Sequence, residues 1–202
     1  DIIFIGDDTE FVPHLGLLTI AALLPDYTEA VYIDEEFIQQ EEMNHHLYDE
    51  HYDLVCLSAY NPQAFRAYKI AEIYKQRGIT VIMGGLHASS LPEEASQYAD
   101  SVFVGEAEET FPDFVKDFEM GVIKKFYKSE KPPDMICSPL PRFDIVPNLA
   151  MYNKIPLIAT RGCPHSCEFC IFPSVYHSSF RHKTVEQVIA EIEMVKKLHP
   201  DP

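Results

Sequence analysis

The sequence has few basic residues and no long apolar run, and these two shortages exclude whole classes of function. Sixteen lysines and arginines stand against 32 aspartates and glutamates, which gives a formal net charge of −16. An acidic surface without a basic cluster repels phosphate backbones, so no nucleic-acid partner is expected. The longest apolar run, Leu15 to Leu24, is too short to cross a bilayer, so no membrane span is expected.

A secretory signal and a disulfide framework are missing as well. The chain opens on Asp1 and an apolar strand pattern rather than on a basic region, which suggests that a few leading residues are absent. Five cysteines are an odd number, whereas a secreted framework spreads an even number along a shorter chain. Three of these cysteines crowd into one short stretch. Clustered thiols in an acidic chain without a signal predict a cytoplasmic protein that binds a metal.

Residues 1–120 alternate short apolar runs with stretches of helical periodicity. The runs predict five strands, at Ile2–Ile5, Ala30–Ile33, Leu54–Ser58, Val81–Met83 and Val102–Val104. The intervening stretches predict helices at Leu15–Leu24, Glu41–Glu50, Gln63–Arg77, Pro92–Tyr98 and Glu108–Met120. This alternation predicts an α/β fold with a doubly wound parallel sheet, for which the flavodoxin-like strand order is the commonest with five strands.

The ends of the predicted strands are the expected ligand site, because doubly wound sheets bind ligands beyond the carboxyl ends of their strands. Glycine at three of the five ends lets a bulky ligand approach the backbone. The ends read Gly6–Asp7–Asp8, Asp34–Glu35, Ser58–Ala59–Tyr60, Gly84–Gly85–Leu86–His87 and Gly105–Glu106.

The pattern changes after residue 120, and three parts are expected: a domain at 1–120, a linker at 121–153 and the start of a second domain at 154–202. Prolines predict that the linker is extended. A new strand is expected at Ile155–Thr160. Thr184 with Gln187 three residues later is typical of a capping box, and it opens a predicted helix over Val185–Leu198 with one apolar face.

The second part contains a cysteine loop, in which Cys163, Cys167 and Cys170 have C-x3-C-x2-C spacing. Three thiolates on one loop can hold an iron–sulfur cluster. Three ligands on four irons leave one iron open, much as catalytic zinc sites keep an open position. A structural zinc site or a four-cysteine cluster needs a fourth ligand, and His165 inside the loop or Cys137 across the linker would have to supply it. These alternatives stay open on the residues alone.

The loop Arg161-Gly-Cys-Pro-His-Ser-Cys-Glu-Phe-Cys170 resembles the signature of the radical S-adenosylmethionine superfamily. Its start and the trailing Phe180–Arg181 resemble the subgroup that carries an N-terminal cobalamin-binding domain. Further blocks of this resemblance are Pro13–Leu17, Ala21–Leu23, Gly84–His87, Pro92–Glu94 and Gly105–Glu108. Together these blocks cover nearly the whole chain.

The resemblance implies a [4Fe–4S] cluster on Cys163, Cys167 and Cys170, S-adenosylmethionine on the open iron, and cobalamin in the first domain. Reductive cleavage of S-adenosylmethionine then yields a 5′-deoxyadenosyl radical. Many members use cobalamin for C-methylation, and others carry out rearrangement or cyclisation. The implied partners are a small-molecule substrate and an electron donor such as flavodoxin or ferredoxin.

The resemblance also implies roles for single residues. Phe169 packs near the adenine or fills core beneath the loop. His14 and Gly16 in the first strand-to-helix loop face the cobalamin. Ser58 and Ala59 line its nucleotide tail, or Ser58 serves only in the packing of its strand end.

Among the remaining candidate residues, His87 and Glu106 have two interpretations each. His87 contacts the corrin or its tail, or else caps the next helix. Gly84, Gly85 and Gly105 let the cofactor approach. Glu106 contacts the cofactor or, with Glu108, stabilises a helix N-terminus. His45 and His46 are expected at the solvated surface.

The sequence departs from this resemblance in two places. The D-x-H-x-x-G motif of other cobalamin enzymes is absent, because Asp34–Gln39 has neither its histidine nor its glycine. Of the partial (βα)6 barrel of the radical domain, only the first strand, the cysteine loop and the first helix are expected, which predicts an N-terminal fragment that is inactive alone. Two other functions stay open: a cobalamin carrier or sensor with a vestigial loop, and a radical enzyme whose first domain no longer binds cobalamin.

Overall fold

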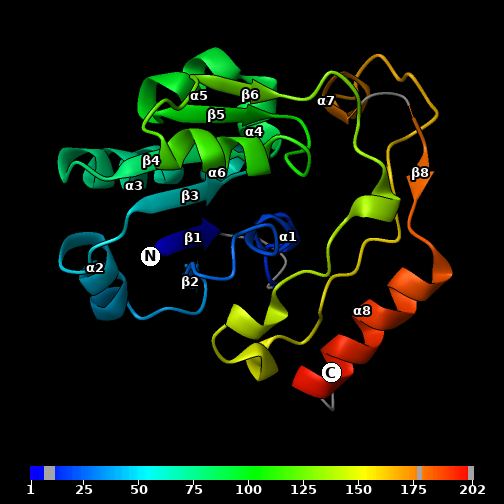
Figure 1. Cartoon of the computed structure of the whole chain (residues 1–202), viewed down its shortest axis with the longest axis horizontal. Coiled ribbons are helices and arrows are strands. Elements are labelled where there is room, and N and C mark those ends of the chain that lie inside the picture. Colours follow the sequence, from blue (N-terminus) through cyan, green and yellow to red (C-terminus); the bar gives the residue numbers. More distant parts are fainter. Residues whose placement is uncertain (7–11, 177–178, 200–202) are drawn as a thin grey trace.

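The computed structural model describes residues 1–6, 12–176 and 179–199, and one parallel sheet dominates it (Figure 1). The sheet order is β2-β1-β3-β4-β5-β6. Its strands are β1 (Ile2–Gly6), β2 (Ala30–Asp34), β3 (Leu54–Ser58), β4 (Thr80–Gly84), β5 (Ser101–Val104) and β6 (Phe126–Lys128). The five predicted strands and their flavodoxin-like order are confirmed. The sixth strand was not predicted, and it lies inside the expected linker.

The helices between these strands largely match the predicted ones. They are α1 (Leu15–Ala21), α2 (Gln40–Tyr48), α3 (Ala64–Gln76), α4 (Gly85–Ser90), α5 (Pro92–Tyr98) and α6 (Phe111–Glu119), followed later by α7 (Phe172–Tyr176) and α8 (Val185–Leu198). The predictions of α5 and α8 are confirmed residue for residue, while α4 was not predicted. At the start of α8 the predicted capping box is present, because the Thr184 hydroxyl accepts from the Gln187 amide and the Gln187 side chain accepts from the Thr184 amide.

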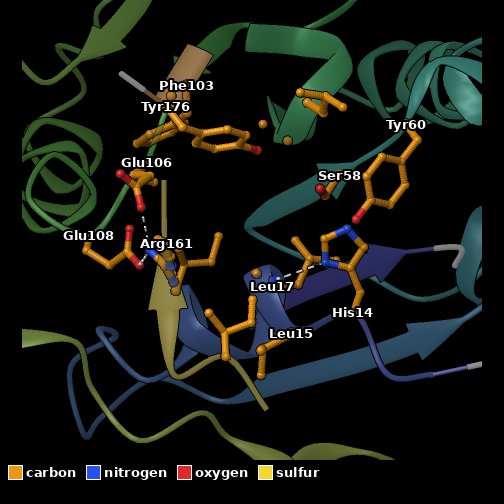
Figure 2. Close-up of a pocket in the computed structure, with 18 of the residues that line it drawn as sticks. His14, Leu15, Leu17, Ser58, Tyr60, Phe103, Glu106, Glu108, Arg161 and Tyr176 are labelled. Carbon is orange, nitrogen blue, oxygen red and sulfur yellow. Dashed lines mark hydrogen bonds and ion pairs between the residues drawn. The ribbon is translucent and has the colours of Figure 1, made fainter. Parts of the chain in front are cut away.

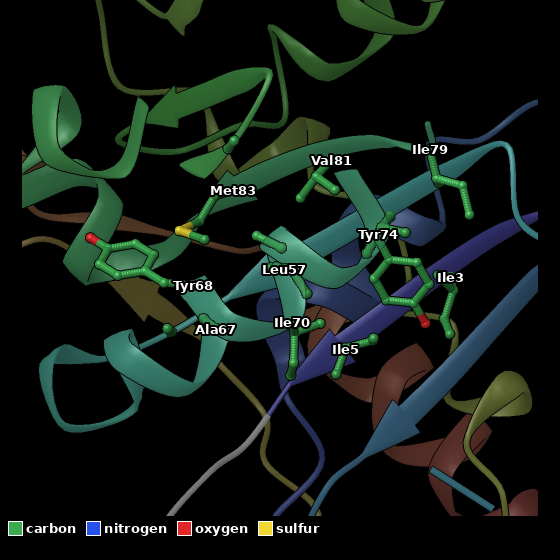
Figure 3. Close-up of a cluster of buried hydrophobic side chains, with 14 of the residues drawn as sticks. Ile3, Ile5, Leu57, Ala67, Tyr68, Ile70, Tyr74, Ile79, Val81 and Met83 are labelled. Carbon is green, nitrogen blue, oxygen red and sulfur yellow. The ribbon is translucent and has the colours of Figure 1, made fainter. Parts of the chain in front are cut away.

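One face of the sheet packs against α2, α3 and α5 (Figure 3). Alternate strand residues point to this face, as the two-residue period of a strand requires. Ile3 and Ile5 of β1, Val55 and Leu57 of β3, and Val81 and Met83 of β4 meet Ala67, Ile70 and Tyr74 of α3. The strands are buried on both faces, which explains why they read as continuous apolar runs in the sequence.

The other face packs against α1, α6 and the segment that follows β6. Phe4, Cys56 and Phe103 of the sheet share one core with α1 and α6, and the same core takes in four residues of the expected linker and one of α8: Phe143, Val146, Leu149, Tyr152 and Val195. This segment contains three 3₁₀ turns, η2 (Met135–Cys137), η3 (Phe143–Ile145) and η4 (Leu149–Met151). Residues 121–153, which were expected to form an extended linker, therefore pack part of their side chains onto this face of the sheet.

The prediction of a strand at Ile155–Thr160 is wrong. Only Thr160–Arg161 (β7) is a strand, and it pairs antiparallel with Arg181–His182 (β8). The apolar residues at 155–158 include the β-branched Ile155 and Ile158, which favour a strand. Within the described ranges these residues have no strand to pair with, and Pro156 and Ile158 instead line a pocket. The first βα unit of a barrel is not seen in this arrangement.

In the part of the chain that the structure describes, no helix combines the length and the apolarity needed to cross a membrane.

Candidate cofactor pocket and cysteine loop

A pocket of about 510 Å³ lies at the carboxyl edge of the sheet (Figure 2). Its walls come from the start of α1, from the ends of β3, β4 and β5, and from the segment that carries the cysteine loop. Of the residues predicted to contact cofactor, the pocket is lined by His14, Gly16, Ser58, Ala59, Gly84, Gly85, Gly105 and Glu106. Parallel strands end at one edge of the sheet, so residues far apart in the sequence meet there. Asp7 and Asp8 lie outside the described residues.

His14 and Tyr60 stand at one end of the pocket (Figure 2). His14 is the N-cap of α1, and its Nδ1 accepts from the Leu17 amide at 3.4 Å. The His14 backbone amide donates to the Tyr32 hydroxyl at 2.8 Å, which ties the loop to β2. An imidazole held as a helix cap has a fixed position, so His14 presents a fixed edge to the pocket.

The floor between β3 and β4 is open because it is built from glycine. Gly85 has a φ of +86°, and a Cβ added there would lie 2.4 Å from Ser58 Oγ. Only glycine adopts this conformation without strain and without that clash. A bulky group can therefore approach the backbone at this edge, as the sequence predicted.

Glu106, Glu108 and Arg161 form the opposite end of the pocket (Figure 2). Arg161 Nη1 donates to Glu106 Oε1 at 2.9 Å and also contacts Glu108 Oε1. The Glu106 side chain is 5% exposed, and its other oxygen lies 2.7 Å from Arg181 Nη2. Burial lowers the pKa of Arg161, but the charges and hydrogen bonds of Glu108 and Glu106 outweigh burial and raise it overall. Two carboxylates and two guanidinium groups thus balance their charges in a buried place.

The expectation that Glu106 and Glu108 stabilise a helix N-terminus is wrong. Helix α6 begins only at Phe111, and the acidic residue of its first turn is Asp113. Both carboxylates bind Arg161 instead, because that guanidinium offers paired hydrogen bonds as well as charge.

His87 does not line the pocket. It is a buried residue of α4, with Nε2 2.6 Å from the Tyr68 hydroxyl and Nδ1 3.1 Å from Asn61 Oδ1. Its side chain caps neither α4 nor α5. The interpretation that His87 caps the next helix is therefore wrong, and the structure places its ring in the packing between α3 and α4. Contact of His87 with cobalamin stays a prediction. His46, expected at the surface, is half-buried against the Tyr52 hydroxyl, while His45 is exposed.

The cysteine loop does not gather its thiols into a metal centre in this structure. Among residues 1–6, 12–176 and 179–199, no three His, Cys, Asp or Glu side chains lie close enough to hold a metal ion. Cys163 and Cys170 are half-buried and Cys167 is exposed. Three thiols on one short loop remain a suitable donor set for iron, but the loop would have to rearrange to bring them together. Phe169 is 93% exposed, so the interpretation that it fills core is wrong.

Sequence reasoning missed several residues of the pocket. Arg161 entered only as part of a motif, and Tyr176 and Phe103 were not considered, although all three line the site. Burial, together with the charges of Tyr60 and Glu106, raises the pKa of Tyr176 to about 12. The signal that could have found Arg161 is the pair of glutamates in Gly105–Glu108, because two acidic residues at a buried strand end need a cationic partner.

The doubly wound sheet and the glycine-edged pocket at its carboxyl end define a cofactor-binding α/β domain of the kind that holds its ligand outside the strand ends. The model of the B12 binding domain family matches residues 4–115, and the chain belongs to this family.

Curated relatives match a longer stretch that includes the cysteine loop. Bacteriochlorophyllide d C-8(2)-methyltransferase of Chlorobaculum tepidum is 33% identical over 95% of this chain and 43% of its own length. Bacteriochlorophyllide d C-12(1)-methyltransferase of the same organism is 32% identical over 88% of this chain and 39% of its length. Hopanoid C-2 methylase of Rhodopseudomonas palustris is 27% identical over 93% of this chain and 35% of its own length. The chain thus spans about two fifths of the length of these relatives.

Proposed function

We propose that the chain is the cobalamin-binding, N-terminal part of a radical S-adenosylmethionine methyltransferase that acts on carbon in a small-molecule substrate. One observation carries the proposal: the pocket of a B12-binding domain shares its wall with the segment that flanks the cysteine loop. Arg161, Gly162 and Phe172 line the same cavity as Ser58 and Gly85. The relatives named above, which are methyltransferases or a methylase, support the reaction class.

The residues present fit a bulky cofactor in the pocket. Gly85 leaves room that a side chain would fill, and the apolar wall of Leu15, Leu17 and Phe103 suits a large ring system. In the proposal, residues 1–120 hold cobalamin, residues 154–202 begin the radical domain, and Cys163, Cys167 and Cys170 bind the cluster. When bound, cobalamin supplies a carrier for the methyl group and the cluster supplies the electron that cleaves S-adenosylmethionine.

The first test is a visible-absorption titration of this chain with hydroxocobalamin. We expect saturable binding by the wild type and its loss in Gly84→Leu, because Gly84 lines the pocket and an added side chain would extend beside Phe103. Gly84→Ala is the matched control, since its Cβ would lie 3.7 Å from the nearest atom, which is ordinary contact. No saturable binding by folded wild-type protein would overturn the cobalamin proposal.

The same titration separates the pocket from the histidine behind it. A folded His87→Ala variant should keep the wild-type affinity and spectrum, because His87 does not line the pocket. A changed cobalt spectrum in this variant would show that His87 reaches the cofactor after all.

The second test addresses the cluster. After anaerobic reconstitution with iron and sulfide, Cys167→Ser should lose most of the bound iron, whereas Cys137→Ser should retain it. Cys137 is also an exposed thiol, but it lies outside the loop. Equal iron in both variants would contradict the assignment of the loop. Full-length protein with an electron donor such as flavodoxin or ferredoxin should yield 5′-deoxyadenosine or S-adenosylhomocysteine, and failure to yield either would contradict the proposed reaction.

A second candidate function is a cobalamin carrier without cluster chemistry. The ungathered thiols favour it, because the described residues hold no assembled metal centre. This candidate predicts cobalamin binding without iron uptake in reconstituted protein, and no cleavage of S-adenosylmethionine by the full-length protein.

A further inference from the structure

The two strands that flank the cysteine loop bring two arginines together. β7 and β8 pair so that Arg161 lies directly opposite Arg181. Like charges that face each other across an antiparallel pair are destabilising. Both side chains are also mostly buried, at 18% and 13% exposed, so water screens their repulsion poorly. This two-stranded ribbon therefore needs an anion.

Glu106 supplies that anion from the other half of the molecule. Its Oε1 accepts from Arg161 and its Oε2 lies against Arg181, so one carboxylate joins the two opposed arginines. Glu108 adds a second carboxylate on Arg161. The four charges sum to zero, and removing the charge of Glu106 would leave one net positive charge in a buried place.

The backbone keeps the ends of the loop close to this carboxylate. Gly162 has a φ of +88°, and a Cβ there would lie 1.7 Å from the Ser179 carbonyl oxygen, so the two ends of the loop segment touch. At Gly105, next to Glu106, an added Cβ would lie 3.4 Å from the Val175 carbonyl oxygen. Residues on both sides of the cysteine loop thus lie close to Glu106 or to its neighbour Gly105, and both of these line the pocket.

We propose that Glu106 is a positioning residue whose carboxylate closes the β7–β8 ribbon and thereby fixes the cysteine loop, Cys163–Cys170, against the pocket. The anchoring itself is independent of any cofactor. The role of this anchoring in catalysis rests on the proposed function. That proposal assigns the pocket to cobalamin and the cysteine loop to the cluster, and the two cofactors must lie at a fixed separation.

Hydrogen–deuterium exchange of the chain without cofactor tests the anchoring. In Glu106→Gln we expect amides of the ribbon, such as that of Lys183, which donates to the Ala159 carbonyl, to exchange about tenfold faster or more. Amides of β3 and β4 should keep their rates. Glu109→Gln is the matched control, because Glu109 is exposed and its carboxylate accepts a hydrogen bond from the Ser129 hydroxyl, away from the ribbon. Equal ribbon exchange in the two variants would overturn the proposal.

A rescue variant separates positioning from general packing. Glu106→Gln combined with Arg181→Gln restores charge balance, so its ribbon should exchange more slowly than that of Glu106→Gln alone. Loss of packing alone predicts the opposite, since the double variant removes more contacts. If Glu106→Gln fails to fold, the folded double variant and Glu106→Asp, which keeps the carboxylate, carry the test. If the ribbon amides of the double variant exchanged about tenfold faster than those of Glu106→Asp, the argument from charge balance would be overturned.

A spectroscopic measurement connects the anchor with the two proposed cofactors. In protein loaded with cob(II)alamin and a reduced cluster, the magnetic coupling between the two centres should report one well-defined separation, and Glu106→Gln should broaden it. Unchanged coupling in a variant with a loosened ribbon would overturn the positioning role. Failure to load either cofactor would contradict the proposed function alone, because the exchange experiment requires neither.

Discussion

In residues 1–128 six strands form one parallel sheet that buries apolar side chains on both faces. In the described part of residues 129–199, by contrast, the two-residue strands β7 and β8 form the one strand pair. The first region packs its own helices on its own sheet. The second places a few apolar residues, among them Phe143, Leu149 and Tyr152, on a face that the first region provides.

The two regions also differ in how buried polar groups are used. The sheet region, residues 1–128, buries mainly apolar side chains of its own. The second region buries one ion pair within itself, Lys183 with Glu191, and places Arg161 and Arg181 on Glu106 of the sheet region. Apolar burial tolerates small changes of geometry, but a buried charge without its partner is costly. The comparison indicates that charge placement determines how the second region folds against the sheet, whereas apolar periodicity determines the fold of the first region.

The largest effect that would sharpen this comparison is expected at Lys183. Both side chains of the Lys183–Glu191 pair are 2% exposed, so Lys183→Met would leave the Glu191 carboxylate buried and unpaired. We expect the free energy of unfolding to fall by about 3–5 kcal/mol, measured by urea denaturation with circular dichroism.

A double variant, Lys183→Met with Glu191→Met, provides the control. Replacing a buried ion pair by apolar residues is often close to neutral, so this variant should recover most of the loss. A Lys183→Met protein as stable as the wild type would show that charge placement does not specify the second region.

The next effect tests the sheet region at the pocket floor. Gly85→Ala should lower the free energy of unfolding by about 2–4 kcal/mol, because it combines an unfavourable φ with a close contact to Ser58 Oγ. Gly84→Ala next to it should change stability by less than about 1 kcal/mol, since its Cβ would make only ordinary contact, 3.7 Å from Phe103. Equal unfolding midpoints for the two variants would contradict this description of the floor.

A smaller effect is expected at the cap of α8. Thr184→Ala removes the hydroxyl that accepts from the Gln187 amide and should cost about 1 kcal/mol of stability. Thr184→Ser should retain most of it, because serine offers the same oxygen. If both variants lose stability equally in thermal unfolding, the methyl group rather than the cap is responsible.

The smallest effect concerns pH in the sheet region. Burial lowers the pKa of His46, and the carboxylate charges of Glu42 and Glu50 offset this only in part. The folded state therefore favours neutral His46, so its contribution is complete above the unfolded pKa of about 6.5 and is lost as pH falls through the lowered folded pKa. Compared with His46→Gln, the wild type should lose more stability between about pH 7.5 and about pH 5. If the free energies of unfolding of the two proteins changed equally with pH, this prediction would be contradicted.

The predictions from sequence succeeded where periodicity and local chemistry decide the structure. Continuous apolar runs located β1 to β5, and the Thr184–Gln187 spacing located the start of α8. The strand β6 was missed because three residues beside a lysine pair carry little periodicity. The strand at 155–160 failed because a strand needs a neighbour, which its own residues do not specify.

The candidate site was predicted in outline and missed in detail for related reasons. Strand ends in a parallel sheet converge whatever their residues, so Ser58, Gly85 and Glu106 could be placed together in advance. The side to which His87 points depends on the short helix α4, which was not predicted. The partners of Glu106 come from residues 55 and 75 positions further on, and no local pattern links them.

The way residues 129–152 lie on the sheet has a practical consequence for expressing the B12-binding domain by itself. The Tyr152 hydroxyl donates to buried Asp34 at 2.7 Å, and the Arg142 amide donates to the Leu18 carbonyl at 3.0 Å, so this stretch covers the side of the sheet where β2 is the edge strand. Ending the polypeptide where the family match ends, at residue 115, would remove β6 and the side chains of 129–152 that share a core with Phe4 and Tyr32. Exposed strand edges and apolar faces promote aggregation. A truncated domain intended for cofactor titrations should therefore extend at least through Tyr152.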